Sequence, residues 1–244
     1  MQKLLNSIIY LSSTDSTNSQ LLNNEHPHLT VLYTFNQTAG RGRLDRTWET
    51  PADKNIALSV LFSPPRISST WLTAILSISL IDTFLYHKIE NSWIKWPNDV
   101  FIEKNKIAGV LTESQWQNSS IKKSVTGIGI NINSTYDDLK HINRPVTSLY
   151  IETGKTFDLH NFLTKYIEII EKYLRITEKD SINIIKEKWI SYSKVIGMKA
   201  SLTEITKGST PIYGIVHHID DEGYLYFNDG KTIFKVVTGD INIL

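Results

Sequence analysis

The sequence predicts a mixed α/β (α+β) fold followed by a small all-β unit at its C-terminal end. Up to about residue 192, segments with helical spacing of apolar residues alternate with strand-like runs. Beyond that point only short β-rich pieces and turns occur, at the spacing of a small barrel of about fifty residues. We therefore expect a mixed β-sheet with helices packed on it in residues 1–192, and a β-barrel in residues 193–244.

Helices are predicted by capping residues and by apolar spacing. Thr17 with Gln20 fits a capping box and starts a short helix. A second helix is expected over about Ser69–Lys88, and its apolar residues on most sides indicate that it is buried. Asp158 is placed to cap a third helix, and a further amphipathic run follows at Ile182–Ile190.

Strands are predicted where β-branched and apolar residues cluster between turn signals. The N-terminal part of the chain contains several such runs, and the C-terminal part contains shorter ones separated by turns. The predicted strands are Thr30–Phe35, Ile56–Phe62, Ser92–Trp96, Ile107–Glu113, Val125–Asn131, Ala200–Ile205, Ile212–Ile219, Tyr224–Phe227 and Thr232–Val237.

Charge balance and the absence of cysteine exclude several kinds of protein. The chain has 26 basic and 25 acidic residues and no long Lys/Arg run, unlike the clustered charge of nucleic-acid-binding proteins. It has no cysteine, which excludes disulfides and thiolate zinc sites and suits a reducing compartment. Its longest apolar stretch, Trp71–Tyr86, is interrupted by polar residues, and its N-terminus lacks a cleavage-site pattern. We expect a soluble, cytoplasmic protein without a membrane span.

The segment Gln37–Trp48 is the densest functional signal. Gly40 and Gly42 let the backbone approach a ligand closely and turn its N–H groups toward an anion. The flanking Arg41 and Arg43 add fixed positive charge for a phosphate or carboxylate. On composition alone, a solvated glycine-rich turn explains the segment equally well. It lacks the Gly-Lys-Ser/Thr of a Walker loop and the last glycine of the dinucleotide fingerprint.

A second signal is Lys95–Asp99, which is followed shortly by Lys106. A strand is expected to stop at the proline, with Asn98 and Asp99 in the turn beyond it. A turn explains Pro-Asn-Asp without any chemistry, and Lys106 has the setting of an exposed hairpin tip. These residues become a candidate site only because the other segments occur in the same chain.

Two further segments are open to both a structural and a functional interpretation. In Gly127–Asn131, two glycines and an asparagine share one face of a strand, which indicates close approach by a ligand or by a packed helix. Asp15–Asn18 has the pattern of a helix start, where backbone donors and hydroxyls can also meet a polar ligand. The sequence does not separate these alternatives.

These four segments, in this order, resemble the biotin protein ligases. The family's Gly-Arg-Gly-Arg loop, Lys-Trp-Pro-Asn-Asp stretch, Lys-Leu/Ile-Ala-Gly strand and Gly-x-Gly-Ile-Asn strand are all present, and the resemblance runs from about Ile8 to the C-terminus. It implies a class II synthetase-like sheet with an SH3-like barrel. It also implies an enzyme that activates biotin with ATP to biotinyl-5'-AMP and transfers biotin to a lysine of a biotin carboxyl carrier protein. The matching stretches are Gly40–Arg43, Lys95–Asp99, Lys106–Gly109, Gly127–Asn131 and, near the end, Gly239–Asp240.

The resemblance implies two sets of binding residues. At one end of the site, polar groups would meet the ureido ring of biotin, and Gly109 would leave room for it. At the other end, Lys106 would hold the biotin carboxylate and the α-phosphate, Trp48 would cover the adenine, and Asn131 would lie by the adenosine. The biotin set is Ser16, Thr17, Asn18, Gln37, Arg41, Lys106 and Gly109. The ATP set is Gly40, Arg41, Gly42, Arg43, Trp48, Asn98, Lys106 and Asn131.

Lys106, Arg43 and Asp99 are the expected catalytic residues. Lys106, the arginine loop and the Mg²⁺ that accompanies ATP would offset the charge that develops when the carboxylate attacks the α-phosphate. Arg43 belongs to a loop that would close over the adenylate. Asp99 is the candidate base for the acceptor lysine. No protein ligands for a metal are predicted.

The sequence departs from the family pattern at two positions, and two alternative functions are considered. Leu44 and Asp45 stand where the family commonly has a basic residue and a glycine, so loop flexibility or adenylate retention is expected to differ. Because the Ser-Thr-Asn motif begins at Ser16, we expect the short form without a DNA-binding domain, acting as a monomer or homodimer. The alternatives are a lipoate or octanoate ligase, which would take a linear acyl chain, and a catalytically silent biotin-binding module.

Overall fold

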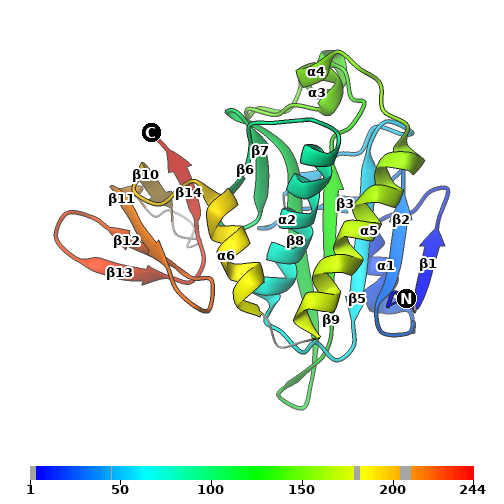
Figure 1. The fold of residues 1–244 in the computed structure, drawn as a ribbon, viewed down its shortest axis with the longest axis horizontal. Helices are drawn as coiled ribbons and strands as arrows, with labels where there is room; N and C mark the ends of the chain where they lie inside the picture. Colours follow the sequence, from blue (N-terminus) through cyan, green and yellow to red (C-terminus); the bar gives the residue numbers. More distant parts are fainter. Residues whose placement is uncertain (1–3, 45, 179–181, 204–209) are drawn as a thin grey trace.

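A computed structural model describes residues 4–44, 46–178, 182–203 and 210–244. Its centre is a seven-stranded mixed sheet in which β1 and β2 are parallel and the other neighbours are antiparallel (Figure 1). In spatial order the strands are β1 (Ser7–Tyr10), β2 (Thr30–Thr34), β5 (Ile56–Phe62), β9 (Ser120–Ile130), β8 (Asn105–Gln117), β7 (Asp99–Ile102) and β6 (Ser92–Lys95).

The strands predicted for this sheet are confirmed, with differences at their ends. β5 has the predicted bounds, whereas β8 begins earlier and runs further than its apolar core indicates. Asp99 was expected in a turn, but it opens β7 and pairs with both Lys95 and Gly109. The cis peptide between Trp96 and Pro97 lies in the short turn that joins β6 to β7.

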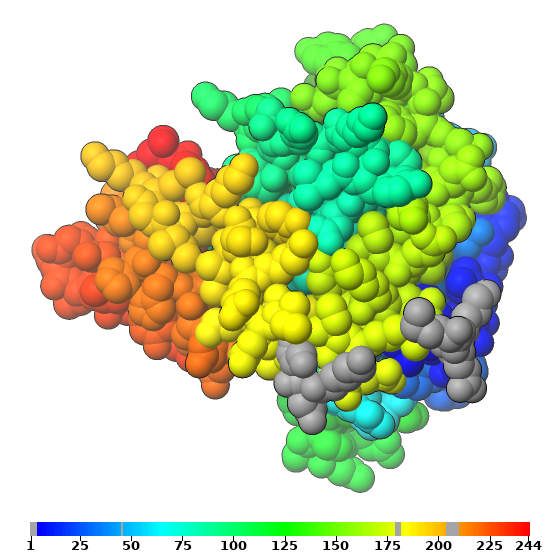
Figure 2. Space-filling model, viewed as in Figure 1, coloured from blue at the N-terminus to red at the C-terminus, as the bar shows by residue number. Residues whose placement is uncertain are grey.

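Three helices cover one face of the sheet. α2 (Ser69–Tyr86), α5 (Leu159–Thr177) and α6 (Ile182–Ser193) lie together on the side that Figures 1 and 2 present. α2 is long and apolar enough to cross a membrane, but 72% of it is buried inside the protein, which is the setting of a core helix. Asp158 caps α5 as predicted, since its side chain accepts the backbone N–H of Asn161.

One carboxylate links these three helices. Asp82 of α2 accepts hydrogen bonds from Tyr173 Oη of α5 at 2.5 Å and from Tyr192 Oη at 2.6 Å, and Lys188 Nζ of α6 lies 3.2 Å away. Burial, together with the bond to Asp82, raises the pKa of Tyr173, so this hydroxyl remains a donor. The helical layer behind the sheet is therefore joined by polar contacts as well as apolar packing.

The opposite face carries the short helix α1 (Thr17–Asn23). It packs against β5 and β9 over a small apolar cluster that is separate from the main core. Its cap is Ser16 rather than the predicted Thr17, because the Ser16 side chain accepts the backbone N–H of Ser19. This leaves the Thr17 hydroxyl free for contacts with neighbouring segments. The small cluster consists of Leu21, Leu32, Leu61 and Val125.

The C-terminal part, for which the sequence predicts a small β-barrel, forms its own five-stranded antiparallel sheet. Within the described residues its two edge strands are not paired with each other. The predicted strand Ala200–Ile205 runs into residues 204–209, outside the described residues. α6 ends at Ser193, and the domain boundary after residue 192 stays a prediction. In spatial order the strands are β13 (Ile233–Val236), β12 (Leu225–Asn228), β11 (Ile212–Ile219), β10 (Lys199–Thr203) and β14 (Asp240–Ile243).

Shorter elements connect these layers. β3 (Gly40–Arg41) and β4 (Thr47–Trp48) pair with each other as a small ribbon. α3 (Tyr136–Leu139) and α4 (Leu149–Thr153) follow β9. None of these four was predicted, because pieces of two to five residues carry too little periodicity to be recognised.

We predict that Asp82→Ala lowers the free energy of unfolding by about 3 kcal/mol, because two largely buried hydroxyls and an ammonium lose their acceptor. Urea denaturation followed by circular dichroism measures this change. Glu168→Ala on the exposed side of α5 is the control, with an expected change within about 0.5 kcal/mol. Equal stability of the two variants would contradict the prediction.

Candidate active site

A cavity on the α1 face gathers most of the residues that the sequence singled out. It lies between the start of α1, the β3–β4 ribbon, the β6–β7 turn and strands β8 and β9. Gly40 and Asn131 are the two predicted site residues that do not line it. The predicted residues that do are Ser16, Thr17, Asn18, Gln37, Arg41, Gly42, Arg43, Trp48, Asn98, Asp99, Lys106 and Gly109.

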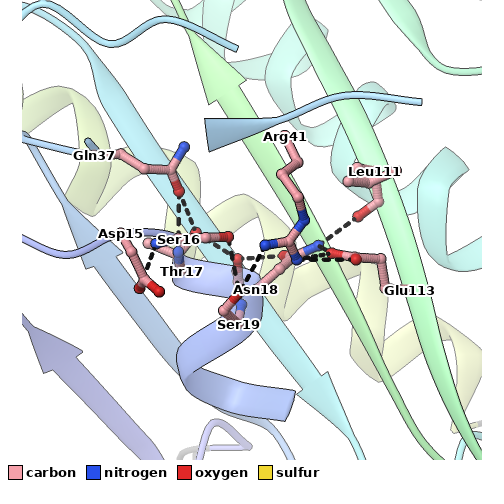
Figure 3. Close-up of polar contacts among 10 residues, drawn as sticks. Asp15, Ser16, Thr17, Asn18, Ser19, Gln37, Arg41, Leu111 and Glu113 are labelled. Carbon is pink, nitrogen blue, oxygen red and sulfur yellow. Dashed lines mark hydrogen bonds and ion pairs between the residues drawn. The ribbon is translucent and has the colours of Figure 1, made fainter. Parts of the chain in front are cut away.

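Thr17 and Gln37 both line the cavity and contact each other. Gln37 Oε1 accepts the Thr17 backbone N–H at 3.0 Å and the Thr17 hydroxyl at 3.3 Å (Figure 3). Gly40 lies behind them, and a Cβ there would come within 2.5 Å of Gln37 Nε2 and 2.3 Å of the Trp48 carbonyl oxygen. Gly40 therefore permits close packing of the ribbon and does not itself face the cavity.

Lys106 also lines the cavity and is not an exposed hairpin lysine. Its side chain is 13% exposed, and Nζ lies 2.6 Å from Asp99 Oδ1. The backbone of Lys106 donates to the Pro145 carbonyl and accepts from the Thr147 N–H, which holds the start of β8 in place. Nζ is also 5.5 Å from the centre of the Trp48 ring. The geometry supports a fixed, partly desolvated ammonium beside a carboxylate.

The arginine loop is held by the C-terminal sheet. Arg43 donates to Asn98 Oδ1 at 3.1 Å and to the Gly239 carbonyl at 3.2 Å, and it lies 3.5 Å from Asp240 Oδ1. Arg46 donates to Asp240 Oδ2 at 2.5 Å. A loop near the N-terminus is thus fastened to β14. Leu44 has a φ of 58°, and Asp45, the other departure from the family pattern, lies outside the described residues.

Two residues of this region had no assigned role at the level of sequence. Asp240 is 194 positions from Arg46 along the chain, and only the resemblance at Gly239–Asp240 pointed to it. Lys95 belongs to the Lys-Trp-Pro-Asn-Asp stretch, and its Nζ donates to Asn242 Oδ1 at 3.3 Å. Burial lowers the pKa of Lys95, although Asp99 and Asp240 act in the opposite direction. Both residues lie where the two sheets meet.

The glycines of β8 and β9 are covered by the chain's own side chains. A Cβ at Gly129 would lie 2.1 Å from Trp48 Nε1, and one at Gly109 would lie 3.0 Å from Lys106 Nζ. Trp48 Nε1 is buried and has no hydrogen-bond partner among the described residues. The space over Gly129 therefore holds Trp48, and the space over Gly109, which the resemblance assigns to biotin, holds Lys106 and the edge of Trp48 in this structure.

Asn131 was expected beside the adenosine, but it does not line the cavity. Its Nδ2 donates to the Thr147 carbonyl at 3.0 Å, and its Oδ1 accepts from Asn55 at 3.4 Å. The side chain is buried and does not line the cavity. In this structure Asn131 connects the end of β9 to the segment before α4.

Comparison with known proteins gives consistent matches over most of the chain. Residues 8–131 match the model of the biotin/lipoate A/B protein ligase family. The bifunctional ligase/repressor BirA of Bacillus spizizenii is 31% identical over 236 residues, which cover 96% of this chain and 72% of that protein. The biotin–[acetyl-CoA-carboxylase] ligase of Paracoccus denitrificans is 28% identical over 224 residues, covering 88% of this chain and 91% of that one.

Solved structures match the whole fold. The biotin protein ligase from Aquifex aeolicus in complex with biotin and ATP superposes with a TM-score of 0.83 at 27% identity, covering 98% of this chain and 99% of that chain. The Leishmania major biotin protein ligase in complex with biotinyl-5-AMP, at 18% identity and a TM-score of 0.63, shares the fold. With the family model covering half of its length, this chain belongs to the biotin/lipoate A/B protein ligase family.

Proposed function

We propose that this protein is a biotin protein ligase. It would join biotin and ATP to biotinyl-5'-AMP with release of pyrophosphate, and then transfer biotin to a lysine of a biotin carboxyl carrier protein. The observation that carries this proposal is the cavity that brings Lys106 of β8 together with Arg41, Gly42 and Arg43 of the arginine loop. The matched relatives are named as ligases, and the names of the Paracoccus denitrificans and Aquifex aeolicus proteins specify biotin, which supports the same reaction.

The first step joins two anions, which explains the need for cations in the cavity. An oxygen of the biotin carboxylate attacks the α-phosphorus of ATP, and the bond to the bridging oxygen of pyrophosphate breaks. Negative charge grows on the phosphate oxygens during this attack, and positioned cations stabilise it. We propose that Lys106 serves the carboxylate and the α-phosphate, while Arg43 serves the phosphates from the loop. Both side chains line the cavity and are already oriented by carboxylates.

In the second step the acceptor amine attacks the biotinyl carbonyl carbon, and AMP leaves with the bonding electrons. With a pKa of about 10.4, about one lysine in 2,500 is neutral at pH 7, so a base that takes the proton is useful. We propose Asp99 for this role. Its ion pair with Lys106 at 2.6 Å would have to open first, and the attraction of Lys106 to the phosphate supplies a reason for it to do so.

We further propose that Mg²⁺ enters with ATP and offsets charge on its phosphates. Among the described residues there is no group of three or more His, Cys, Asp or Glu side chains suited to hold a metal on their own. Asp99 and Asp240 line the cavity, and Mg²⁺ commonly takes one or two carboxylates in addition to phosphate oxygens. Both carboxylates are paired with cations here, so the phosphates would supply most of the ligands.

We also propose that the enzyme works in the cytoplasm, as a monomer or homodimer, without a nucleic-acid partner. The near balance of acidic and basic residues and the lack of cysteine support this setting. The family description includes lipoate ligases, and the biotin-specific names of the full-length relatives favour biotin as the acyl donor.

The decisive test of the function mixes the protein with ATP, Mg²⁺, a biotin carboxyl carrier domain and either biotin or lipoate. We expect an avidin blot to show label on the acceptor with biotin, and mass spectrometry to show no added lipoyl mass. Transfer of lipoate instead would support the alternative ligase. Binding of biotin without label on the acceptor would support a catalytically silent module.

Lys106→Ala is expected to reduce biotin-dependent exchange of pyrophosphate into ATP by at least about a thousandfold, because the reacting carboxylate and phosphate lose their shared cation. Biotin binding, measured by calorimetry, should weaken much less, because the ureido end of the cavity is untouched. Lys104→Ala, two positions away in the β7–β8 turn, is the control and should exchange normally. Near-normal exchange by Lys106→Ala would remove this residue from the chemistry.

Asp240→Asn is expected to loosen the arginine loop, because one carboxylate contacts both Arg43 and Arg46. Release of preformed biotinyl-5'-AMP should become about tenfold faster, the effect of losing a charged hydrogen bond. Rapid filtration with radiolabelled biotin measures this rate. Asp229→Asn, in an exposed turn of the C-terminal sheet, is the control. An unchanged release rate would show that the loop does not depend on Asp240.

A further inference from the structure

Glu113 is a carboxylate that contacts the cavity-lining residues Asn18 and Arg41, and the reaction assigns no role to it. It lies on β8, on the same face as Gly109, and its side chain is 29% exposed. Both of its oxygens accept from Arg41 NH2, at 2.9 and 3.0 Å, and Oε2 also accepts from Asn18 Nδ2 at 2.8 Å (Figure 3). One carboxylate therefore joins the arginine loop and α1 to the central sheet.

The side-chain amide of Asn18 forms three hydrogen bonds with other residues of the protein. Its Nδ2 donates to Glu113 and to the Leu111 carbonyl at 3.2 Å, and its Oδ1 accepts from Ser59 at 2.6 Å. An amide nitrogen has two hydrogens, so both side-chain donors of Asn18 are used within the protein. The residue is only 4% exposed. Asn18, expected in the biotin set, is therefore bound to the sheet by its own hydrogen bonds.

A missing side chain on β9 makes this contact possible. A Cβ at Gly127 would lie 2.2 Å from Asn18 Oδ1 and 2.9 Å from Ser59 Oγ. Gly127 pairs directly with Leu111 of β8, so the gap that it leaves lies beside the carbonyl that Asn18 reaches. Because Gly127 has no side chain, Asn18 of α1 can pack directly against the sheet.

Arg41 completes the connection between α1 and β8. Its NH1 donates to Ser19 Oγ at 2.6 Å while its NH2 holds Glu113. The first turn of α1, with Thr17 and its partner Gln37, is consequently fixed from two sides. This end of the arginine loop depends on Glu113, whereas the far end depends on Asp240.

We propose that Glu113 is a positioning residue for biotin, acting through Arg41 and Asn18 without touching the substrate. The inference rests on the proposed biotin ligase function and deepens it. Through Asn18 and Arg41, Glu113 fixes the part of the cavity that Thr17 and Gln37 form, whereas the proposed chemistry takes place at Lys106 and Asp99. Its loss should impair capture of biotin and leave the chemical step and ATP binding nearly unchanged.

The test is Glu113→Gln in the full chain, assayed by biotin-dependent pyrophosphate exchange. The amide keeps an oxygen for Asn18 but loses the charge that holds Arg41. We expect the KM for biotin to rise about tenfold, with kcat and the KM for ATP changed by less than about threefold. Glu168→Gln, a carboxylate of an exposed pair on α5, is the matched control.

Two further variants separate positioning from general destabilisation. Gly127→Ala should raise the KM for biotin in the same selective way, because its methyl group displaces Asn18. Arg41→Gln added to Glu113→Gln should raise that KM by less than about twofold more, because the two residues act as one unit. Glu113→Asp, which keeps the charge, should recover part of the lost affinity even if Glu113→Gln folds poorly.

The outcomes are distinct. An unchanged biotin KM in Glu113→Gln, or equal increases for biotin and ATP, overturns the inference while the wild-type enzyme still activates biotin. Wild-type protein that shows no biotin-dependent exchange overturns the proposed function itself. A selective rise in the biotin KM in Glu113→Gln and in Gly127→Ala supports the inference.

Discussion

Mutual repulsion among the cations of one cavity is the constraint on which the rest of this structure depends. Five positively charged side chains line this cavity, those of Arg41, Arg43, Arg46, Lys106 and Arg144, and like charges gathered in one cavity repel each other. Four of the five are offset by a carboxylate. The pairs are Arg41 with Glu113, Arg43 and Arg46 with Asp240, and Lys106 with Asp99.

These carboxylates come from three different places in the fold, and this explains the architecture around the site. Glu113 lies on a long central strand, Asp99 opens the neighbouring strand, and Asp240 belongs to the C-terminal sheet. The arginine loop therefore spans between two sheets and is held at both ends. In this arrangement the C-terminal sheet contributes Asp240 to the lining of the cavity.

The glycines of the two central strands accommodate side chains of two different kinds. Trp48 packs over Gly129 with its indole nitrogen buried and without a hydrogen-bond partner among the described residues. A buried donor without a partner is costly. Gly127, by contrast, is filled by the fully bonded Asn18 and belongs to the permanent framework.

The sequence alone determined the class of fold, most of the central strands, the long helices and the four segments that make the cavity. Apolar periodicity is a local property, and ordered motifs survive as patterns along the chain, so both can be read without coordinates. The prediction of the cap of α1 from the sequence was wrong by one position. Neighbouring residues with hydroxyl groups can each serve as the cap, and only packing selects between them.

Only the tertiary structure decided which groups meet. The pairing of Arg46 with Asp240, of Arg41 with Glu113 and of Asn18 with the gap at Gly127 joins positions that are far apart along the chain. No local pattern encodes such contacts, because a carboxylate on a strand has the same local signature whether it faces solvent or an arginine. Sheet register and the docking of the C-terminal sheet place the partners, and these are set by the burial of the whole core.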